Sequence, residues 1–301
     1  MNKKTIIGLV LSVLLVILGG GYLIAAYVGT QSIKEQVQQY LKENNLQENV
    51  KIKGYSYNPL TGKVSLDGIS IRGFPQPGTV IDIDRFEITE YSLPEGFRVP
   101  VRFEAYAYGI DAFIDGKNFR YDFYQKMWYD TEKNVFNIEK VQIKNQKLEV
   151  EFSAVLEKFR PELLKIDPQE KQTEYIEYLT EIFPSEVVVS YTDRGFTEEI
   201  IKEVAQRQKA RPEKLKEILI SELKTYREKS QDAYMKKLVE GAVYILENGG
   251  GRITINIKAT QEITVDRLVL AFMFMGSLPV SDIISVLDDY YEAEITYGRA
   301  I

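Results

Sequence analysis

The fold of this chain is decided by the stretch KVSLDGISI at residues 63–71. Apolar and polar residues alternate along it, which is the pattern of a β-strand with one buried face. The two apolar residues before Gly68 share one parity, whereas Ile69 and Ile71 share the other. Because a shift of one residue turns every side chain to the opposite face, the strand needs a bulge or bend, and glycine tolerates that backbone.

The same pattern extends outward from this stretch in both directions. Residues 50–53 alternate as well, and the turn at residues 58–62 joins them to the central stretch as a hairpin. The change of parity recurs within residues 81–88, so two successive bent strands predict a curved sheet. Further strand-like runs joined by short turns follow at residues 99–113, 120–124, 134–143 and 147–156. Short connections between strands are typical of an antiparallel meander.

After residue 160 the pattern changes to one dominated by helical periods. Helices are expected within residues 167–183, from residue 197 onward, and within 212–226, 231–247 and 281–287, with strands at 187–191, 253–257 and 293–297. The predicted fold class is therefore α+β: an N-terminal transmembrane helix, a curved antiparallel β-meander over residues 49–160 and a helix-rich α+β module over residues 161–301. The uncharged run 268–281 is interpreted as a buried core segment, with a methionine-rich docking surface as the alternative.

The N-terminal region is strongly apolar. Residues 5–30 form 26 consecutive positions without a formal charge, and as a helix at about 1.5 Å per residue they would exceed the roughly 30 Å hydrocarbon core of a bilayer. A cleaved signal peptide has a shorter apolar region, so we expect residues 1–30 to form an uncleaved signal anchor. Lys3 and Lys4 before the span predict a cytoplasmic N-terminus in a single-pass protein of the inner (cytoplasmic) membrane. A stalk helix over residues 31–48 would lead into the exported, periplasmic bulk of the chain.

Composition excludes several classes of protein. Among the 301 residues there is no cysteine and no histidine, which removes zinc fingers, iron-sulfur clusters and Ser-His-Asp triads. The net charge is −6, and without Lys3 and Lys4 the exported part would carry about −8, which opposes nucleic acid. Phosphate-cradling glycine loops and the nucleophile elbow are also missing from the sequence, so no cofactor, no metal and no catalytic residue is predicted.

Two groups of acidic residues could form a cation site or a catalytic carboxylate pair. Asp82 and Asp84 share a strand face that could hold a hard cation, although a solvated face explains them as well. Asp193 with Glu198 and Glu199 could form a carboxylate pair, but a turn aspartate and two carboxylates at a helix start have a structural cause. For both groups we favour the structural interpretation over a metal or catalytic site.

Two alternating patterns carry a resemblance to a known family. They are Gly62-x-Val64-x-Leu66-x-Gly68-Ile69-x-Ile71 and Ile83-x-x-Phe86-x-Ile88. Together with the apolar N-terminus and the strands that follow, they resemble the N-terminal β unit of AsmA-like bacterial envelope proteins. The resemblance implies an inner-membrane-anchored periplasmic protein concerned with lipid homeostasis or outer-membrane assembly.

The strand that opens the aromatic-rich stretch offers the candidate ligand site. Phe103, Ala105 and Ala107 share one apolar face with small side chains, where an acyl chain would fit, although a packed core would look the same in sequence. We therefore expect a non-catalytic envelope protein that handles lipid or assists envelope assembly. The alternatives are a structural scaffold subunit without a ligand and, less favoured, an extracytoplasmic hydrolase. The expected partners are the membrane, lipid and other envelope proteins, and not nucleic acid.

Overall fold

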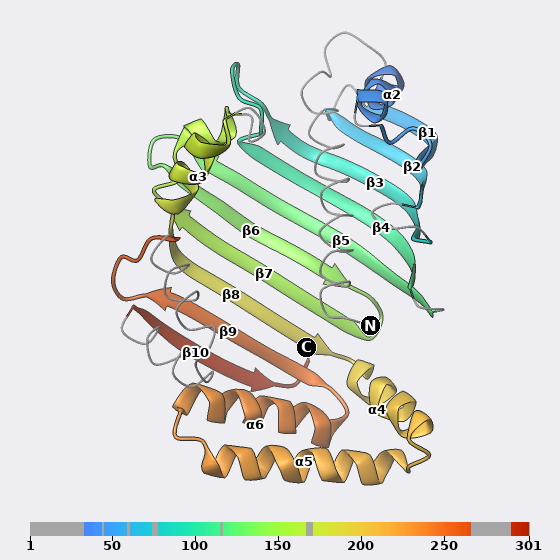
Figure 1. Ribbon diagram of the computed structural model, residues 1–301, viewed down its shortest axis with the longest axis vertical. Coiled ribbons are helices and arrows are strands. Elements are labelled where there is room, and N and C mark those ends of the chain that lie inside the picture. The colour runs from blue at the N-terminus through green and yellow to red at the C-terminus, as the bar shows by residue number, and fades with distance from the viewer. Residues whose placement is uncertain are drawn as a thin grey trace. The chain divides into compact units, whose positions relative to one another are not determined.

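A computed structural model describes residues 33–43, 45–58, 61–73, 78–114, 117–166, 171–265 and 290–300. These residues form ten strands, β1 to β10, and five α-helices, α2 to α6 (Figure 1). The strands pair antiparallel, and they follow one another in the sheet in the order in which they occur in the chain. The topology is thus a continuous meander. The chain divides into two compact units.

Unit 1 consists of residues 1–132 and 160–175. Its elements are α2 (Ile33–Glu43), β1 (Val50–Asn58), β2 (Lys63–Arg72), β3 (Val80–Ser92), β4 (Arg102–Ile114), β5 (Lys117–Asp130) and a 3₁₀ turn, η1 (Pro161–Leu164). Helix α2 lies where the sequence predicts the stalk, and it packs through Val37 and Leu41, which are buried. The backbone of residues 98 and 99 donates to the Leu164 carbonyl, which ties η1 to the segment before β4.

The core of unit 1 is one apolar face of its sheet. Alternation places isoleucine, valine, phenylalanine and alanine on this face of each strand, and burying such side chains is the main favourable term in folding. The buried apolar residues of β2 to β5 on this face are Val64, Leu66, Ile69, Ile71, Ile81, Ile83, Phe86, Ile88, Phe103, Ala105, Ala107, Ile110, Ala112 and Phe123.

The strands of this sheet bend at matching positions, where the buried face changes parity. We call this line of bends, marked by Gly68 and Gly109, the crease. Gly68 in β2 has φ +61°, as the sequence predicts for the point between Leu66 and Ile69. The register of β2 with β3 is nevertheless the same on both sides of Gly68, so both strands turn over together and no residue is inserted. In β4 the matching position is Gly109, with φ +59°, where the pairing with β5 shifts by one residue. The predicted bends are therefore real, and they align across neighbouring strands.

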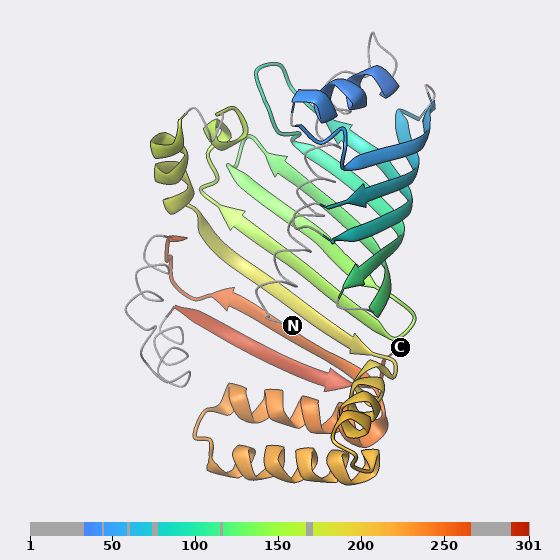
Figure 2. The same cartoon turned by 45° about the vertical axis from the view of Figure 1, so that its right-hand side comes forward.

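Unit 2 consists of residues 133–159 and 176–301. Its strands are β6 (Val135–Lys144), β7 (Leu148–Glu157), β8 (Phe183–Asp193), β9 (Gly251–Ala259) and β10 (Tyr291–Gly298), and its helices are α4 (Phe196–Arg207), α5 (Pro212–Lys229) and α6 (Ala233–Asn248). Helix α3 (Gln172–Thr180) crosses the boundary of the two units. Helix α5 lies beside α6, and α6 packs against β9 and β10 (Figure 2). A Cβ at Gly241 would lie 2.9 Å from Cγ1 of Ile253, so glycine permits this close packing of α6 on β9.

The fold class predicted from the sequence is wrong. A separate helix-rich α+β module was expected after residue 160, but the strands of that region, β8, β9 and β10, continue the antiparallel meander after β7. The predicted helix before Pro184 ends at Thr180, and β8 begins at Phe183 rather than at Val187. Sequence periodicity identifies a strand but not its partner, which is why strands separated by helices were assigned to a module of their own.

The predicted transmembrane signal anchor is not supported by the fold either. Within the described ranges, no helix is long and apolar enough to cross a membrane. Residues 5–30 lie outside those ranges, as do the whole uncharged run 268–281 and the helix predicted at residues 281–287.

Candidate functional site

The three predicted site residues lie together on the apolar face of unit 1. Phe103, Ala105 and Ala107 all belong to β4, and the two alanines have no exposed surface. Their side chains share one face because they are two residues apart on a strand. The sequence therefore predicted their common orientation correctly, whereas lipid binding by them stays a prediction.

The neighbouring strands give this row its character. Ala105 is paired with Ile88 on β3 and Gln125 on β5, and Ala107 is paired with Phe86 and Phe123. Directly opposite residues of antiparallel strands have Cβ atoms about 4.5–5.5 Å apart, so each alanine lies between two larger side chains. A row of small side chains along β4 is thus flanked by rows of large ones on β3 and β5.

One polar side chain interrupts the apolar face. Gln125 lies between Phe123 and Met127 at the apolar parity of β5 and is only 3% exposed. Its Nε2 lies 3.5 Å from the Met127 sulfur, which is a weak acceptor. We did not single out Gln125 from the sequence, although the signal was present: a polar residue at an apolar position of an alternating strand.

The opposite face of β4 carries a carboxylate held by hydroxyl groups. Glu104 accepts hydrogen bonds from Thr89 Oγ1 at 2.5 Å and from the Tyr124 hydroxyl at 2.8 Å. Burial raises the pKa of the Glu104 carboxyl, but these hydrogen bonds outweigh burial and the pKa lies below its ordinary value. The ring of Tyr106 packs against that of Tyr124, with the ring centroids 4.5 Å apart and the planes tilted by 39°. The charged form of Glu104 is therefore the stable one, which suits a structural anchor rather than a proton donor.

The two carboxylates considered as a cation site, Asp82 and Asp84, form ion pairs with arginines. Asp82 accepts two hydrogen bonds from Arg72 Nη2, both at 2.8 Å, and Asp84 pairs with Arg120. Arg120 on β5 reaches Asp84 across Gly109 on β4, because Gly109 has no side chain in the way. A Cβ at Gly109 would collide with both side chains. No cluster of three or more metal-ligating side chains occurs in the described parts of the chain.

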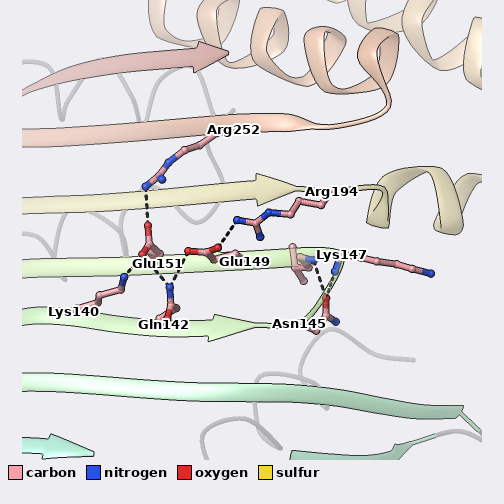
Figure 3. A network of polar contacts seen from close by, with 9 residues as sticks. Lys140, Gln142, Asn145, Lys147, Glu149, Glu151, Arg194 and Arg252 are labelled. Carbon is pink, nitrogen blue, oxygen red and sulfur yellow. Dashed lines mark hydrogen bonds and ion pairs between the residues drawn. The ribbon is translucent and has the colours of Figure 1, made fainter. Parts of the chain in front are cut away.

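In unit 2, polar and charged side chains of β6, β7 and β9 and of Arg194, the residue after β8, form a network on one face of the sheet (Figure 3). Glu149 accepts from Arg194 Nη2 at 2.8 Å, and Glu151 accepts from Arg252 Nη2 at 2.7 Å. The buried Gln142 donates to both carboxylates, at 2.8 and 3.2 Å. The two glutamates thus connect β6, β7 and β9 and the residue after β8, which fixes strand register and leaves the carboxylates partnered.

The carboxylate of Asp193 has an equally structural role. It is 1% exposed and accepts backbone hydrogen bonds from Gly195 and Phe196 through Oδ1 and from Thr197 through Oδ2. These are N–H groups at the start of α4 that have no partner within the helix. Tyr191 also donates to Oδ2, at 3.0 Å, and burial raises the pKa of Tyr191 to about 12. Asp193 is therefore a helix cap and not only the turn aspartate that the sequence predicted, while Glu198 and Glu199 form ion pairs with Lys216 and Lys147 respectively.

Comparison with known proteins adds one match. A family described as "Uncharacterized protein" matches residues 143–287, just under half of the chain. No curated protein matches the chain. The description of the matching family names no activity.

Proposed function

We propose that this protein is a non-catalytic lipid-handling protein that binds an acyl chain along β4 on the apolar face of unit 1. The observation that carries the proposal is that three of the five β4 residues on this face, Ala105, Ala107 and Ala112, have small side chains and lie between larger side chains of β3 and β5. From Phe103 to Ala112 this row measures about 30 Å at roughly 3.3 Å per residue. A bilayer core of about 30 Å holds two acyl chains end to end, so one chain of about 15 Å fits along the row.

Gln125 supplies a polar group at a defined place on this face. It lies directly opposite Ala105, and its amide can bond to the carboxyl or ester oxygen of a lipid. Apolar binding sites typically combine a large apolar lining with a few placed polar groups that fix orientation. We therefore infer that Gln125 orients the polar end of the acyl chain. The resemblance of the β2 and β3 patterns to AsmA-like proteins supports the same class of activity and implies a cell-envelope location.

A structural scaffold is the second candidate. The observation in its favour is that Ala105 and Ala107 have no exposed surface, which is what a filled core shows. In a scaffold the face would be packed by protein side chains, and no ligand would be present.

Lipid analysis of the purified full-length chain separates the two. The measurement is mass spectrometry of co-purifying lipid, together with urea denaturation of the wild type, Ala105→Trp and the control Ala210→Trp, whose alanine is exposed. Under the lipid proposal, Ala105→Trp loses the lipid at little cost in stability, because the indole occupies the space of the acyl chain. Under the scaffold alternative, no lipid is found and Ala105→Trp costs about 1–3 kcal/mol or more through overpacking.

Gln125→Leu tests the orienting role. The change keeps the face apolar and removes the amide, so we expect the bound lipid to decrease while the free energy of unfolding stays the same or rises. Lipid content equal to that of the wild type would contradict the role of Gln125 without affecting the acyl-chain site itself.

A further inference from the structure

The first and last strands of the meander have one strand neighbour each, while α2 contacts β1 and α6 contacts β10. β1 pairs with β2 alone, and β10 pairs with β9 alone, among the described residues. An edge strand exposes a row of unpaired N–H and C=O groups that can pair with another chain, and proteins often protect such edges with charged side chains. The charges on the two edges of this protein have opposite sign.

The β1 edge is basic. Lys51 and Lys53 are exposed on the polar side of the strand, while Val50 and Ile52 lie on the other side, buried and half-buried respectively. Lys53 Cδ would lie 2.7 Å from a Cβ at Gly68, so this side chain extends over the polar face of β2.

The β10 edge is acidic. Glu292 and Glu294 are exposed on the polar side of the strand, while Ala293 is half-buried and Ile295 is buried on the apolar side. Helix α6 packs near Tyr297, whose Cβ would lie 3.3 Å from a Cβ at Gly241. This contact of α6 is near the C-terminal end of β10, whereas the two glutamates lie in the N-terminal half of the strand.

The two edges match residue by residue in one antiparallel register. With Lys51 opposite Glu294, the next position places Ile52 opposite Ala293, and the one after that places Lys53 opposite Glu292. In the other direction Val50 lies opposite Ile295. Opposite charges and apolar pairs at directly opposed positions stabilise antiparallel strands, and like charges there destabilise them.

We propose that a second copy of this chain docks by strand addition, its β10 edge pairing with the β1 edge of the first copy. The contact is heterologous, so a pair of copies keeps one β1 edge and one β10 edge unused, and association continues to a closed ring or an open filament. Main-chain hydrogen bonds provide the attraction, and the two Lys–Glu pairs select the register. This inference is independent of the proposed lipid binding.

Reciprocal charge reversal in the full-length chain tests the proposal. The two variants are Lys51→Glu with Lys53→Glu, and Glu292→Lys with Glu294→Lys. Analytical ultracentrifugation should show concentration-dependent self-association of the wild type, and each variant alone should associate at least about tenfold more weakly, because every junction then opposes like charges. An equimolar mixture of the two variants should associate again, because each junction between unlike variants joins glutamate to lysine.

The matched control is Lys202→Glu with Lys214→Glu, which changes the net charge equally at exposed positions on α4 and α5. This control should associate like the wild type. A wild type that remains monomeric at its highest soluble concentration would overturn the proposal. Self-association that charge reversal leaves unchanged, or that mixing does not restore, would overturn it equally.

Discussion

The sheets of the two units share one pattern and differ in burial. In unit 1, the isoleucines at the centre of the face, Ile71, Ile81, Ile83 and Ile88, are each only 1% exposed. In unit 2, the corresponding residues of β8 and β9, such as Val189 and Ile255, are half-buried. The described helix that packs on the unit 2 sheet is α6, which contacts β9 and β10. Alternation thus defines which face is apolar, but the elements packed on that face decide how deeply it is buried.

The largest expected effect comes from one substitution made in both units. Ile83→Ala should cost about 3–5 kcal/mol of unfolding free energy, because it leaves a cavity in a fully buried face. Ile255→Ala should cost only about 1–2 kcal/mol, because a half-buried side chain loses less contact and water can fill the space. Urea denaturation measures both, and equal costs would show that the two faces are buried alike.

The cap of α4 gives the next largest effect. Asp193→Ala removes the acceptor of the helix N–H groups and leaves them buried, which should cost about 2–4 kcal/mol. Hydrogen exchange should show faster exchange at α4 than at the strands of unit 1. Asp193→Asn keeps one acceptor and serves as the milder control. Unchanged stability of Asp193→Ala would mean that other groups cap the helix.

The crease of unit 1 is tested at Gly109. Gly109→Ala should cost about 1–3 kcal/mol, because the backbone has a positive φ and the new Cβ collides with the Arg120–Asp84 ion pair. The control is Gly62→Ala, which has φ +70° and no neighbour within 4 Å of the new Cβ, so it reports the backbone strain alone. Thermal denaturation would then show a smaller loss for Gly62→Ala, and equal losses would remove the ion pair from the explanation.

The smallest effect is the pH dependence that Glu104 contributes to unit 1. Its pKa is lowered on folding, so its stabilising contribution is present above the unfolded pKa of about 4.3 and is lost as the pH falls through the lower folded value. Glu104→Gln removes this titration. The difference in melting temperature between wild type and Glu104→Gln should therefore be larger at neutral pH than in acid, and a pH-independent difference would contradict the prediction.

Much of the local structure follows from the sequence. The strands around Gly68, the change of face there and the shared orientation of Phe103, Ala105 and Ala107 are all consequences of alternation and glycine conformation. Gln125 was equally readable, because its parity alone places it on the apolar face. Each of these features depends on residues within a few positions of one another in the chain.

Tertiary structure alone decided which strands pair and which faces are deeply buried. The pairing of β7 with β8 and of β9 with β10 joins residues that are far apart in the chain, and the period of a strand carries no information about its neighbour. The contact of Arg120 with Asp84 likewise depends on a strand between them that lacks a side chain at Gly109. Local chemistry fixes the conformation of a segment, whereas pairing and burial are properties of the whole sheet and are set only when distant segments pack together.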